Sequence, residues 1–390
     1  MKLVDDSLLE QLNTLVVLLD HKGRIVHTGN SVKKLLGYYP AELTGISWWR
    51  MIEKQDGQAV NSPELKMLLH PGSEVKSVSF ERKIKTSGGE TCWIRWNILK
   101  TEDNSFVLVG NDITLSKLTE YKLQQLNREL KSKNNELTDS IQYARRLQEA
   151  IFPDISRLNH YFQGAFVYYK PKDVLSGDFY WYHRSGNKLV VAAVDCTGHG
   201  VPGALLSILA NSLLRDVVIN KGMELPSAIL YSLDEELSTA LSNDKNADVT
   251  KDGMDVAVCV FDFEKDTFTF SGAFRPLVRV TNGGLIEYKG SRYPIGYFHD
   301  EEKQFYDVSG SLQQGDCFYL FSDGYADQFG GEISTGKAAR KMNRKRFYDL
   351  LLTSSNMETS EQESFLHYAH NNWKQNEEQT DDVMVMGIKV

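Results

Sequence analysis

The first part of the chain, residues 1–114, alternates between hydrophobic and polar positions in several short runs. A period of two over residues 15–20 and 24–28, on either side of a His-Lys-Gly turn, predicts a β-hairpin. Short helical patterns follow at residues 31–38 and 40–45. The strand period then returns in three runs, residues 78–84, 91–99 and 105–111. This order of two strands, short helices and three strands predicts a small domain of mixed helix and sheet.

The next segment, residues 115–151, contains neither Gly nor Pro and is rich in Lys, Glu, Gln, Asn and Leu, which predicts one long helix. Its heptad a and d positions are Leu123, Leu126, Leu130, Lys133, Leu137, Ser140, Ala144, Leu147 and Ile151. Apolar residues at this spacing favour a parallel coiled-coil dimer, although a single amphipathic helix packed on its own domain has the same pattern. The polar residues Lys133 and Ser140 interrupt the row of apolar a and d positions in the middle of the helix. This interruption fits either a weak point that allows signalling or a shift of the heptad register onto Ile141.

The last part of the chain, residues 152–390, mixes strand-like runs with helical patterns. The strand-like runs are residues 165–170, 178–183, 189–195, 256–263, 267–273, 277–281, 317–322 and 383–390. The helical patterns are residues 203–220, 226–241, 344–352 and 361–373. Because no strand-helix-strand unit repeats, packed antiparallel sheets with helices outside fit better than a doubly wound parallel sheet. The fold class predicted for the whole chain is therefore multidomain α+β.

The composition narrows the class of protein. With 390 residues, of which 41% are hydrophobic, the chain is long enough for two or three domains. Its net charge of -8 argues against nucleic-acid binding, because no basic excess exists to neutralise phosphates. The four cysteines lie far apart without a Cys-x-x-Cys pair, which is typical of reduced thiols in a cytoplasmic protein. We expect no membrane attachment, because no apolar run approaches the roughly 20 residues that span a bilayer and the N-terminus does not resemble a signal peptide.

The most distinctive stretch is residues 195–204. A strand-like run ends at Asp195, and a glycine-rich turn and an apolar helix with Pro202 in its first turn follow. The glycines allow the backbone to turn sharply and to approach a ligand closely. A lone acid in such a corner is usually a turn or cap residue. Its interpretation therefore depends on the other acids of this part of the chain.

Asp178, Asp323 and Asp381 occupy similar positions, at the ends of strand-like runs or in the turns beside them. Converging carboxylates without a cluster of His or Cys suit Mg²⁺ or Mn²⁺ better than Zn²⁺. Two such ions, about 3.5 to 4 Å apart, activate a water molecule and hold a phosphoryl group. The four aspartates together therefore predict a two-metal site for phosphoryl transfer to water.

The order of elements over residues 1–114 resembles the PAS family. The phrases that carry this resemblance are Leu19-Asp-His-Lys-Gly-Arg-Ile25, Leu36-Gly-Tyr38 and Gly110-Asn-Asp-Ile-Thr114. PAS domains are sensory or dimerising modules with divergent sequences, so the resemblance does not identify a ligand. Cys92 lies in a predicted strand and not on the central helices, which does not fit a flavin photoadduct.

Residues 152–390 resemble the SpoIIE-type branch of the metal-dependent PPM serine/threonine phosphatases. The motifs, in chain order, are Ser176-Gly-Asp-Phe-Tyr180, Asp195-x-x-Gly-His-Gly-Val-Pro-Gly-Ala-Leu205, Asp252-Gly-Met-Asp255, Gly272-Ala-x-x-Pro-Leu277, Tyr293-Pro-Ile-Gly296, Phe321-Ser-Asp-Gly-Tyr325, Asp327-Gln-Phe-Gly-Gly331 and Asp381-Asp-Val. The resemblance implies two stacked antiparallel sheets flanked by helices, two Mn²⁺ or Mg²⁺ ions, and hydrolysis of phosphoserine or phosphothreonine on a protein. In bacteria that protein is commonly an anti-sigma-factor antagonist of the STAS fold.

The same resemblance implies roles for individual residues. The implied metal ligands are Asp178, Asp195, the Cys196 main-chain carbonyl, Asp323 and Asp381. Asp195 bridges both ions, and Asp178 reaches them directly or through water. Asp323 and Asp381 hold the ion that binds the attacking water. Asp381 is preferred to Asp382 because the first acid of the pair aligns with the family's ligand, and the second is left to cap or orient.

Two further residues are candidates for the chemistry. His199 is a candidate to protonate the leaving oxygen, because histidine is the side chain most often used for proton transfer near neutral pH. In better-known relatives the histidine follows the aspartate by two positions and here by four, so the alternative is that His199 shapes the turn and caps the helix. Arg275 is the candidate contact of the substrate phosphate, because Phe274 stands where the family often has a polar residue. The basic run of residues 337–346 either guides an acidic phosphoprotein or is a solvated loop and helix start.

These expectations combine into a signal-regulated protein phosphatase with three parts: a PAS sensor at residues 1–114, a coiled-coil signalling helix at 115–151, and a SpoIIE-type PPM domain at 152–390. We expect a cytoplasmic homodimer joined through the coiled coil, whose partner is a phosphorylated protein and whose PAS ligand is unknown. The alternative is a catalytically degenerate scaffold that binds phosphoproteins. The retained acids favour the enzyme.

Overall fold

The computed structural model describes residues 14–48, 68, 70, 74–241, 252–296, 302–331 and 338–390. The chain separates into two compact units, Met1–Asn134 and Asn135–Val390, and we describe each by itself. The boundary falls inside the long helix α6 (Thr114–Ile151). The predicted division into three parts, with limits at residues 114 and 151, therefore stays a prediction.

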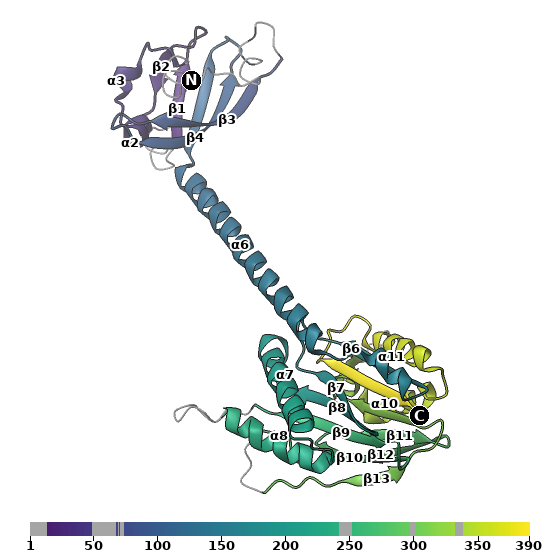
Figure 1. Cartoon of the computed structure of the whole chain (residues 1–390). Helices are drawn as coiled ribbons and strands as arrows, with labels where there is room; N and C mark the ends of the chain where they lie inside the picture. The colour runs from purple at the N-terminus through teal and green to yellow at the C-terminus, as the bar shows by residue number, and fades with distance from the viewer. Residues whose placement is uncertain are drawn as a thin grey trace. The chain divides into compact units, whose positions relative to one another are not determined.

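The first unit is built on a five-stranded antiparallel sheet with the order β2-β1-β5-β4-β3 (Figure 1). Its elements are β1 (Thr14–Leu19), β2 (Ile25–Thr28), α2 (Ser31–Leu36), α3 (Pro40–Leu43), β3 (Ser77–Lys85), β4 (Thr91–Lys100) and β5 (Phe106–Asp112). Burial alternates along β4, so that Ile94, Trp96 and Ile98 face the core. Trp48 packs edge-on against Trp96 with ring centroids 4.6 Å apart. The predicted hairpin, short helices and three later strands are confirmed.

Helix α6 begins one residue before the predicted helix and ends with it at Ile151. The leucines of the predicted seam are exposed: Leu123 by 58%, Leu126 by 54%, Leu130 by 67% and Leu137 by 59%. A row of exposed leucines at heptad spacing is what one strand of a coiled coil presents to a partner. The helix is confirmed, and the dimer stays a prediction.

The second unit consists of two five-stranded antiparallel sheets. The first has the order β13-β10-β9-β8-β7 and contains β7 (Phe179–Ser185), β8 (Lys188–Cys196), β9 (Met254–Asp262), β10 (Thr267–Ala273) and β13 (Val308–Ser311). The second has the order β12-β11-β14-β17-β6 and contains β6 (Gly164–Lys170), β11 (Leu277–Thr281), β12 (Gly284–Tyr288), β14 (Cys317–Phe321) and β17 (Val383–Lys389). Phe261, Phe268 and Phe318 interlock between the two sheets. This is the predicted packing of two antiparallel sheets.

Helices cover the outer faces of both sheets (Figure 1). The first sheet carries α7 (Gly200–Arg215), the π-helical turn η2 (Asp216–Asn220) and α8 (Pro226–Leu241), and the second carries α9 (Gly324–Asp327), α10 (Asn343–Ser354) and α11 (Thr359–Lys374). The remaining short elements are η1 (Ile155–His160), β15 (Phe329–Gly330) and β16 (Arg340–Lys341). The predicted helix 203–220 is therefore two elements, because the helix begins earlier and its last five residues have π geometry.

One expectation needs correction. Residues Gly200–Asn220, 21 residues whose most apolar stretch has a mean hydropathy of 1.4, are long and apolar enough to cross a membrane by length and composition. Half of the most apolar part of this segment is buried inside the unit, as expected for a core helix.

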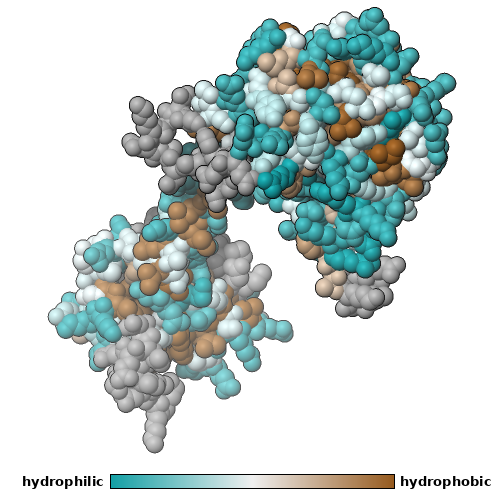
Figure 2. Space-filling model, turned by 90° about the horizontal axis from the view of Figure 1, so that it is seen from below, coloured by the Kyte–Doolittle hydropathy of each residue, from teal (hydrophilic) through white to brown (hydrophobic). Residues whose placement is uncertain are grey.

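On the face of the molecule seen in Figure 2, hydrophobic residues form separate patches among hydrophilic ones. Such scattered patches are ordinary on folded domains.

Candidate metal centre

A hollow of about 280 Å³ lies where several strands of the second unit end. Its lining residues are Asp195, Cys196, Thr197, Gly198, Gly253, Met254, Asp255, Arg275, Pro294, Asp323 and Asp381. Asp195 is the next-to-last residue of β8, Asp323 follows β14, and Asp381 precedes β17. The two sheets thus bring together four of the five predicted ligand residues, Asp195, Cys196, Asp323 and Asp381, from three distant parts of the sequence.

Asp255 is a member of this site that the sequence prediction of ligands missed. It lies directly opposite Asp195 in the antiparallel pairing of β8 with β9. Two like charges at facing positions destabilise a strand pair unless a cation lies between them. The sequence motif Asp252-Gly-Met-Asp255, just before a strand-like run, could have suggested Asp255 as a ligand. However, only the register of the sheet places Asp255 beside Asp195.

Two glycines allow the turn that carries Asp178 to approach the turn after β8. A Cβ at Gly177 would lie 2.6 Å from the carbonyl oxygen of Gly198, and a Cβ at Gly203 would clash with the same oxygen. Asp178 is only 2% exposed as a result, and its Oδ2 has no hydrogen-bond partner among the residues that the structure describes. Burial, together with the charge of Asp195, raises the pKa of Asp178 well above its ordinary value. Ser322 and the charge of Arg275 favour the ionised form without offsetting this burial, so a further cation beside Oδ2 would stabilise ionised Asp178.

Arg275 lies among the carboxylates. Its Nη2 is 2.6 Å from Oδ2 of Asp195, 2.8 Å from Oδ2 of Asp323 and 3.0 Å from Oδ2 of Asp255. The residue is 4% exposed, and its Nε has no partner among the described residues. The sequence analysis expected Arg275 to contact the substrate phosphate, whereas in this structure its guanidinium is the counter-ion of three acids.

One guanidinium does not neutralise this many acids. Burial raises the pKa of Asp195 to about 7 and that of Asp255 to about 6, in each case against the opposing effect of Arg275. Burial also raises the pKa of Asp381. Raised carboxylate pKa values at one end of a sheet are typical of a functional site that lacks part of its positive charge.

The residues present fit a divalent metal. The side-chain donors are carboxylate oxygens, which suit Mg²⁺ or Mn²⁺, and the unpartnered Oδ2 of Asp178 lacks a cation. Among the described residues, no three His, Cys, Asp or Glu side chains already form a cluster that could hold an ion. Arg275 explains this, because its Nη2 lies between the acids. An ion held by these carboxylates would therefore compete with the guanidinium for their oxygens.

The neighbouring acids Asp381 and Asp382 have different surroundings. Asp381 lines the hollow. Asp382 is 3% exposed and accepts hydrogen bonds from the backbone N–H groups of Lys172 and Gly177, both at 2.7 Å. Its carboxylate thereby holds the turn that leads to Asp178. This placement agrees with the expectation that the second acid orients the site.

His199 lies beside the site and is not among the residues that line the hollow. Its Nδ1 is 2.5 Å from Oδ2 of Asp173, and its Nε2 is 3.1 Å from Nζ of Lys172. It occupies the N-cap position of α7 but makes no capping hydrogen bond with its side chain. The alternative of a side-chain cap is not seen, and the role in catalysis stays a prediction.

Comparisons with known proteins agree with this architecture. Residues 185–390 match the family model of stage II sporulation protein E (SpoIIE), and residues 13–115 match a PAS domain model. No curated relative matches the chain. The solved SiaA-PP2C domain of Pseudomonas aeruginosa is 29% identical, with a TM-score of 0.59 over 66% of this chain and 98% of that one.

Two other solved structures match less closely. The PP2C phosphatase domain of SpoIIE from Bacillus subtilis, with a fragment of its regulatory domain, is 17% identical, with a TM-score of 0.45 over 58% of this chain and 62% of that one. The RsbU and RsbW domains of a Mycobacterium tuberculosis protein are 18% identical, with a TM-score of 0.44 over 58% of this chain and 59% of that one. The SpoIIE model covers more than half of the chain. The chain therefore belongs to the SpoIIE family of PPM serine/threonine protein phosphatases and carries a PAS domain ahead of its phosphatase domain.

Proposed function

We propose that this protein is a signal-regulated phosphatase that uses two Mn²⁺ or Mg²⁺ ions to remove phosphate from serine or threonine of a partner protein. The observation that carries the proposal is the convergence of Asp195, Asp255, Asp323 and Asp381 on one hollow in a SpoIIE domain. A STAS-domain anti-sigma-factor antagonist in the cytoplasm is the proposed substrate.

The carboxylates would hold the ions. Asp195, the Cys196 carbonyl, Asp323 and Asp381, which line the hollow, would hold them together with Asp178, whose pKa responds to the charge of Asp195. When bound, the ions lower the pKa of water and offset the charge of the phosphoryl group. We add Asp255 to this set because it faces Asp195 across the sheet.

Arg275 and His199 would act on the substrate. Once released from the carboxylates, the guanidinium of Arg275 is free to pair with two phosphoryl oxygens, a geometry that suits its planar fork. Asp173 would accept a hydrogen bond from Nδ1 of His199 and orient the ring, and delivery of a proton from Nε2 to the departing serine or threonine oxygen would require a proton on both ring nitrogens. Lys172 faces that nitrogen at 3.1 Å and would have to move aside.

Regulation would pass through the end of α6. Gln148 is 3% exposed, and its Nε2 donates to the Ser176 carbonyl at 2.6 Å and to Oγ of Ser207 at 2.9 Å. Ser176 is two residues from Asp178, and Ser207 lies on α7, which begins beside Asp195. A rotation or shift of α6 therefore moves the backbone that positions Asp178. This supports transmission of a PAS signal through a dimeric coiled coil to the metal site.

A catalytically degenerate scaffold is the second candidate, and the ion pairs of Arg275 favour it, because an internal cation can close a site permanently. Hydrolysis of p-nitrophenyl phosphate by the full chain with Mn²⁺ separates the two. We expect metal-dependent turnover that Asp195→Ala and Asp323→Ala abolish, while Glu361→Ala, at an exposed position of α11 outside both hollows, keeps it. Equal rates in the wild type and in the two site variants would overturn the enzyme assignment.

A further inference from the structure

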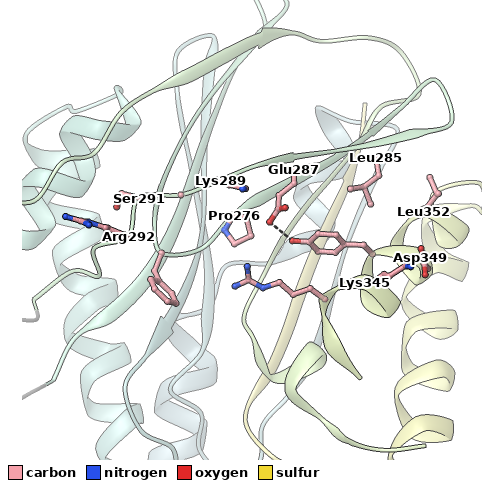
Figure 3. Close-up of a pocket in the computed structure, with 13 residues that line it drawn as sticks. Pro276, Leu285, Glu287, Lys289, Ser291, Arg292, Lys345, Asp349 and Leu352 are labelled. Carbon is pink, nitrogen blue, oxygen red and sulfur yellow. Dashed lines mark hydrogen bonds between the residues drawn. The ribbon is translucent and has the colours of Figure 1, made fainter. Parts of the chain in front are cut away.

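A larger hollow of about 720 Å³ is lined by the residues that Figure 3 draws as sticks. We call it the Phe274 groove. Its lining residues are Phe274, Pro276, Leu285, Glu287, Lys289, Gly290, Ser291, Arg292, Arg344, Lys345, Tyr348, Asp349 and Leu352. They come from the loop after β10, from β12 and the loop that follows it, and from α10. These elements form one side of the second unit next to the metal-site hollow.

The two hollows share their walls. Phe274 and Pro276 line the groove, while Arg275 between them lines the carboxylate site. In the same way Arg292 lines the groove and Pro294 lines the carboxylate site. A substrate protein with its phosphorylated side chain at the carboxylates would therefore have the residues that flank the phosphate close to the groove.

The backbone keeps the two sides of this wall apart. Phe274 has a φ of 65°, a left-handed conformation that is uncommon for an aromatic residue. Its N–H donates to the Ser291 carbonyl at 3.0 Å, and a Cβ at Gly290 would lie 2.6 Å from the Arg275 carbonyl oxygen. This crowding fixes the loop so that the Phe274 ring is 49% exposed while Arg275 is buried. Strain of this kind, where the surrounding structure enforces it, is often found at ligand sites.

The groove is locally basic in an acidic protein. Lys289, Arg292, Arg344 and Lys345 are exposed on its rim, against the acids Glu287 and Asp349. Glu287 accepts a hydrogen bond from the Tyr348 hydroxyl at 2.9 Å, which Figure 3 shows as a dashed line. Lys289 and Lys345 form no ion pair with any residue in the described part of the chain. The rim therefore has positive charge to offer to a partner.

The floor of the groove is partly apolar. Phe274, Pro276, Leu285 and Leu352 contribute hydrophobic surface to it. Two of the rim cations, Arg344 and Lys345, belong to the basic run of residues 337–346, of which Lys337 lies outside the described residues. The combination of basic rim and apolar floor fits an acidic segment that also carries a hydrophobic side chain.

We propose that the Phe274 groove binds the part of the phosphoprotein substrate that flanks the phosphorylated serine or threonine, and that this part is acidic with one hydrophobic anchor. The inference rests on the proposed phosphatase function and adds the sequence class of its substrate. The rim cations select the acidic flank, Phe274 contacts the anchor, and the shared wall sets the distance between anchor and phosphate.

The test uses the full chain with Mn²⁺ and two phosphoserine peptides of equal length. One carries Asp, Glu and Leu beside the phosphoserine, and in the other Asn and Gln replace the acids. The wild type should show a kcat/KM about tenfold higher for the acidic peptide. Arg344→Gln combined with Lys345→Gln should bring this ratio close to one. The matched control Arg157→Gln combined with Lys265→Gln removes the same charge at exposed positions outside the groove and should keep the ratio.

A second variant tests the apolar contact. Phe274→Asn removes the ring but keeps a residue type that tolerates positive φ. It should raise the KM for the Leu-containing acidic peptide and not for the same peptide with Leu replaced by Ser. A ratio near one in the wild type, or a ratio that the groove variants do not change, would overturn the groove while leaving the phosphatase intact.

The two proposals fail separately. If the wild type hydrolyses neither p-nitrophenyl phosphate nor the peptides, the phosphatase function fails, and fluorescence anisotropy of the labelled acidic peptide then tests the groove alone. Weaker binding in the Arg344 and Lys345 variant than in the control would support the groove. Equal binding in both would overturn it.

Discussion

Replacement of Arg275 should have opposite effects on the metal-free protein and on metal binding. Arg275→Met keeps most of the length of the side chain and removes its charge. That charge faces Asp195 at 2.6 Å and Asp255 at 3.0 Å from a side chain that is 5% exposed. The contact with Asp323 at 2.8 Å counts for less, because the Asp323 side chain is 42% exposed and water screens the pair.

The magnitude follows from the burial of these groups. At an effective dielectric constant of about 20, two charges about 3 Å apart attract by about 5 kcal/mol, and desolvation of both groups offsets much of this. Removal of one partner of a buried pair typically costs about 3–5 kcal/mol, because the other charge is left uncompensated. We expect metal-free Arg275→Met to lose stability in this range.

Metal binding should change in the opposite direction. In the wild type an incoming Mn²⁺ displaces the Arg275 guanidinium from Asp195 and Asp255, whereas in Arg275→Met it meets carboxylates without a competitor. Breaking the ion pairs of Arg275 costs free energy in the wild type only, and hydration of the released guanidinium returns part of it. We expect the remaining cost to be at least about 1.4 kcal/mol, so that Arg275→Met binds Mn²⁺ at least about tenfold more tightly.

Calorimetric titration of the full chain with Mn²⁺, without substrate, measures this affinity, and thermal melts measure the stability. Arg279→Met is the matched control, because Arg279 forms a buried pair with Asp316 at 2.5 Å and is not among the residues that line the carboxylate hollow. It should destabilise the protein without changing the Mn²⁺ affinity. Arg275→Met that binds Mn²⁺ as the wild type does, or more weakly, would refute the competition between guanidinium and metal.

Three other predictions concern the acids, the linker and the dimer. Because burial raises the pKa of Asp195 to about 7, the folded metal-free protein keeps a proton that the unfolded chain loses. This stability is lost as the pH rises from about 4 to 7, so the melting temperature should fall between about pH 5 and pH 7, and Asp195→Asn should reduce the fall. An equal fall in both proteins would contradict the assignment. Gln148→Ala should lower Mn²⁺-dependent turnover about tenfold, by analogy with other outer-shell partners of metal ligands, whereas Gln142→Ala, exposed on the same helix, should not. Leu130→Glu combined with Leu137→Glu should give a monomer by light scattering and altered turnover, and unchanged mass and rate would exclude coupling through the coiled coil.

Much of the fold follows from patterns that are local in the sequence. The continuous apolar run before Asp195 is a central strand buried on both faces, and helix α6 was recognisable from its lack of Gly and Pro. His370 of helix α11 is buried with its Nδ1 3.2 Å from the Tyr168 hydroxyl, and burial lowers its pKa to about 3. By contrast, β12 and β13 escaped prediction, since they are short and only partly buried and have no strong alternation.

The parts of the site that could not be predicted depend on tertiary geometry. Asp255 joins Asp195 only through the register of β8 with β9, which no local pattern records. Arg275 faces inward because Phe274 adopts a positive φ and the loop is crowded against Gly290. A motif shows that such residues belong to one site, but the direction of each side chain comes from the packing of distant segments.

The central claim is that these carboxylates hold two metal ions in place of the Arg275 guanidinium. Anomalous diffraction at the manganese edge, from crystals of the full chain grown with Mn²⁺, tests it most directly. The account predicts two peaks about 3.5 to 4 Å apart, bridged by Asp195, with Arg275 turned away from Asp195 and Asp255. A map without peaks in this hollow, with Arg275 still paired to both acids, would contradict it.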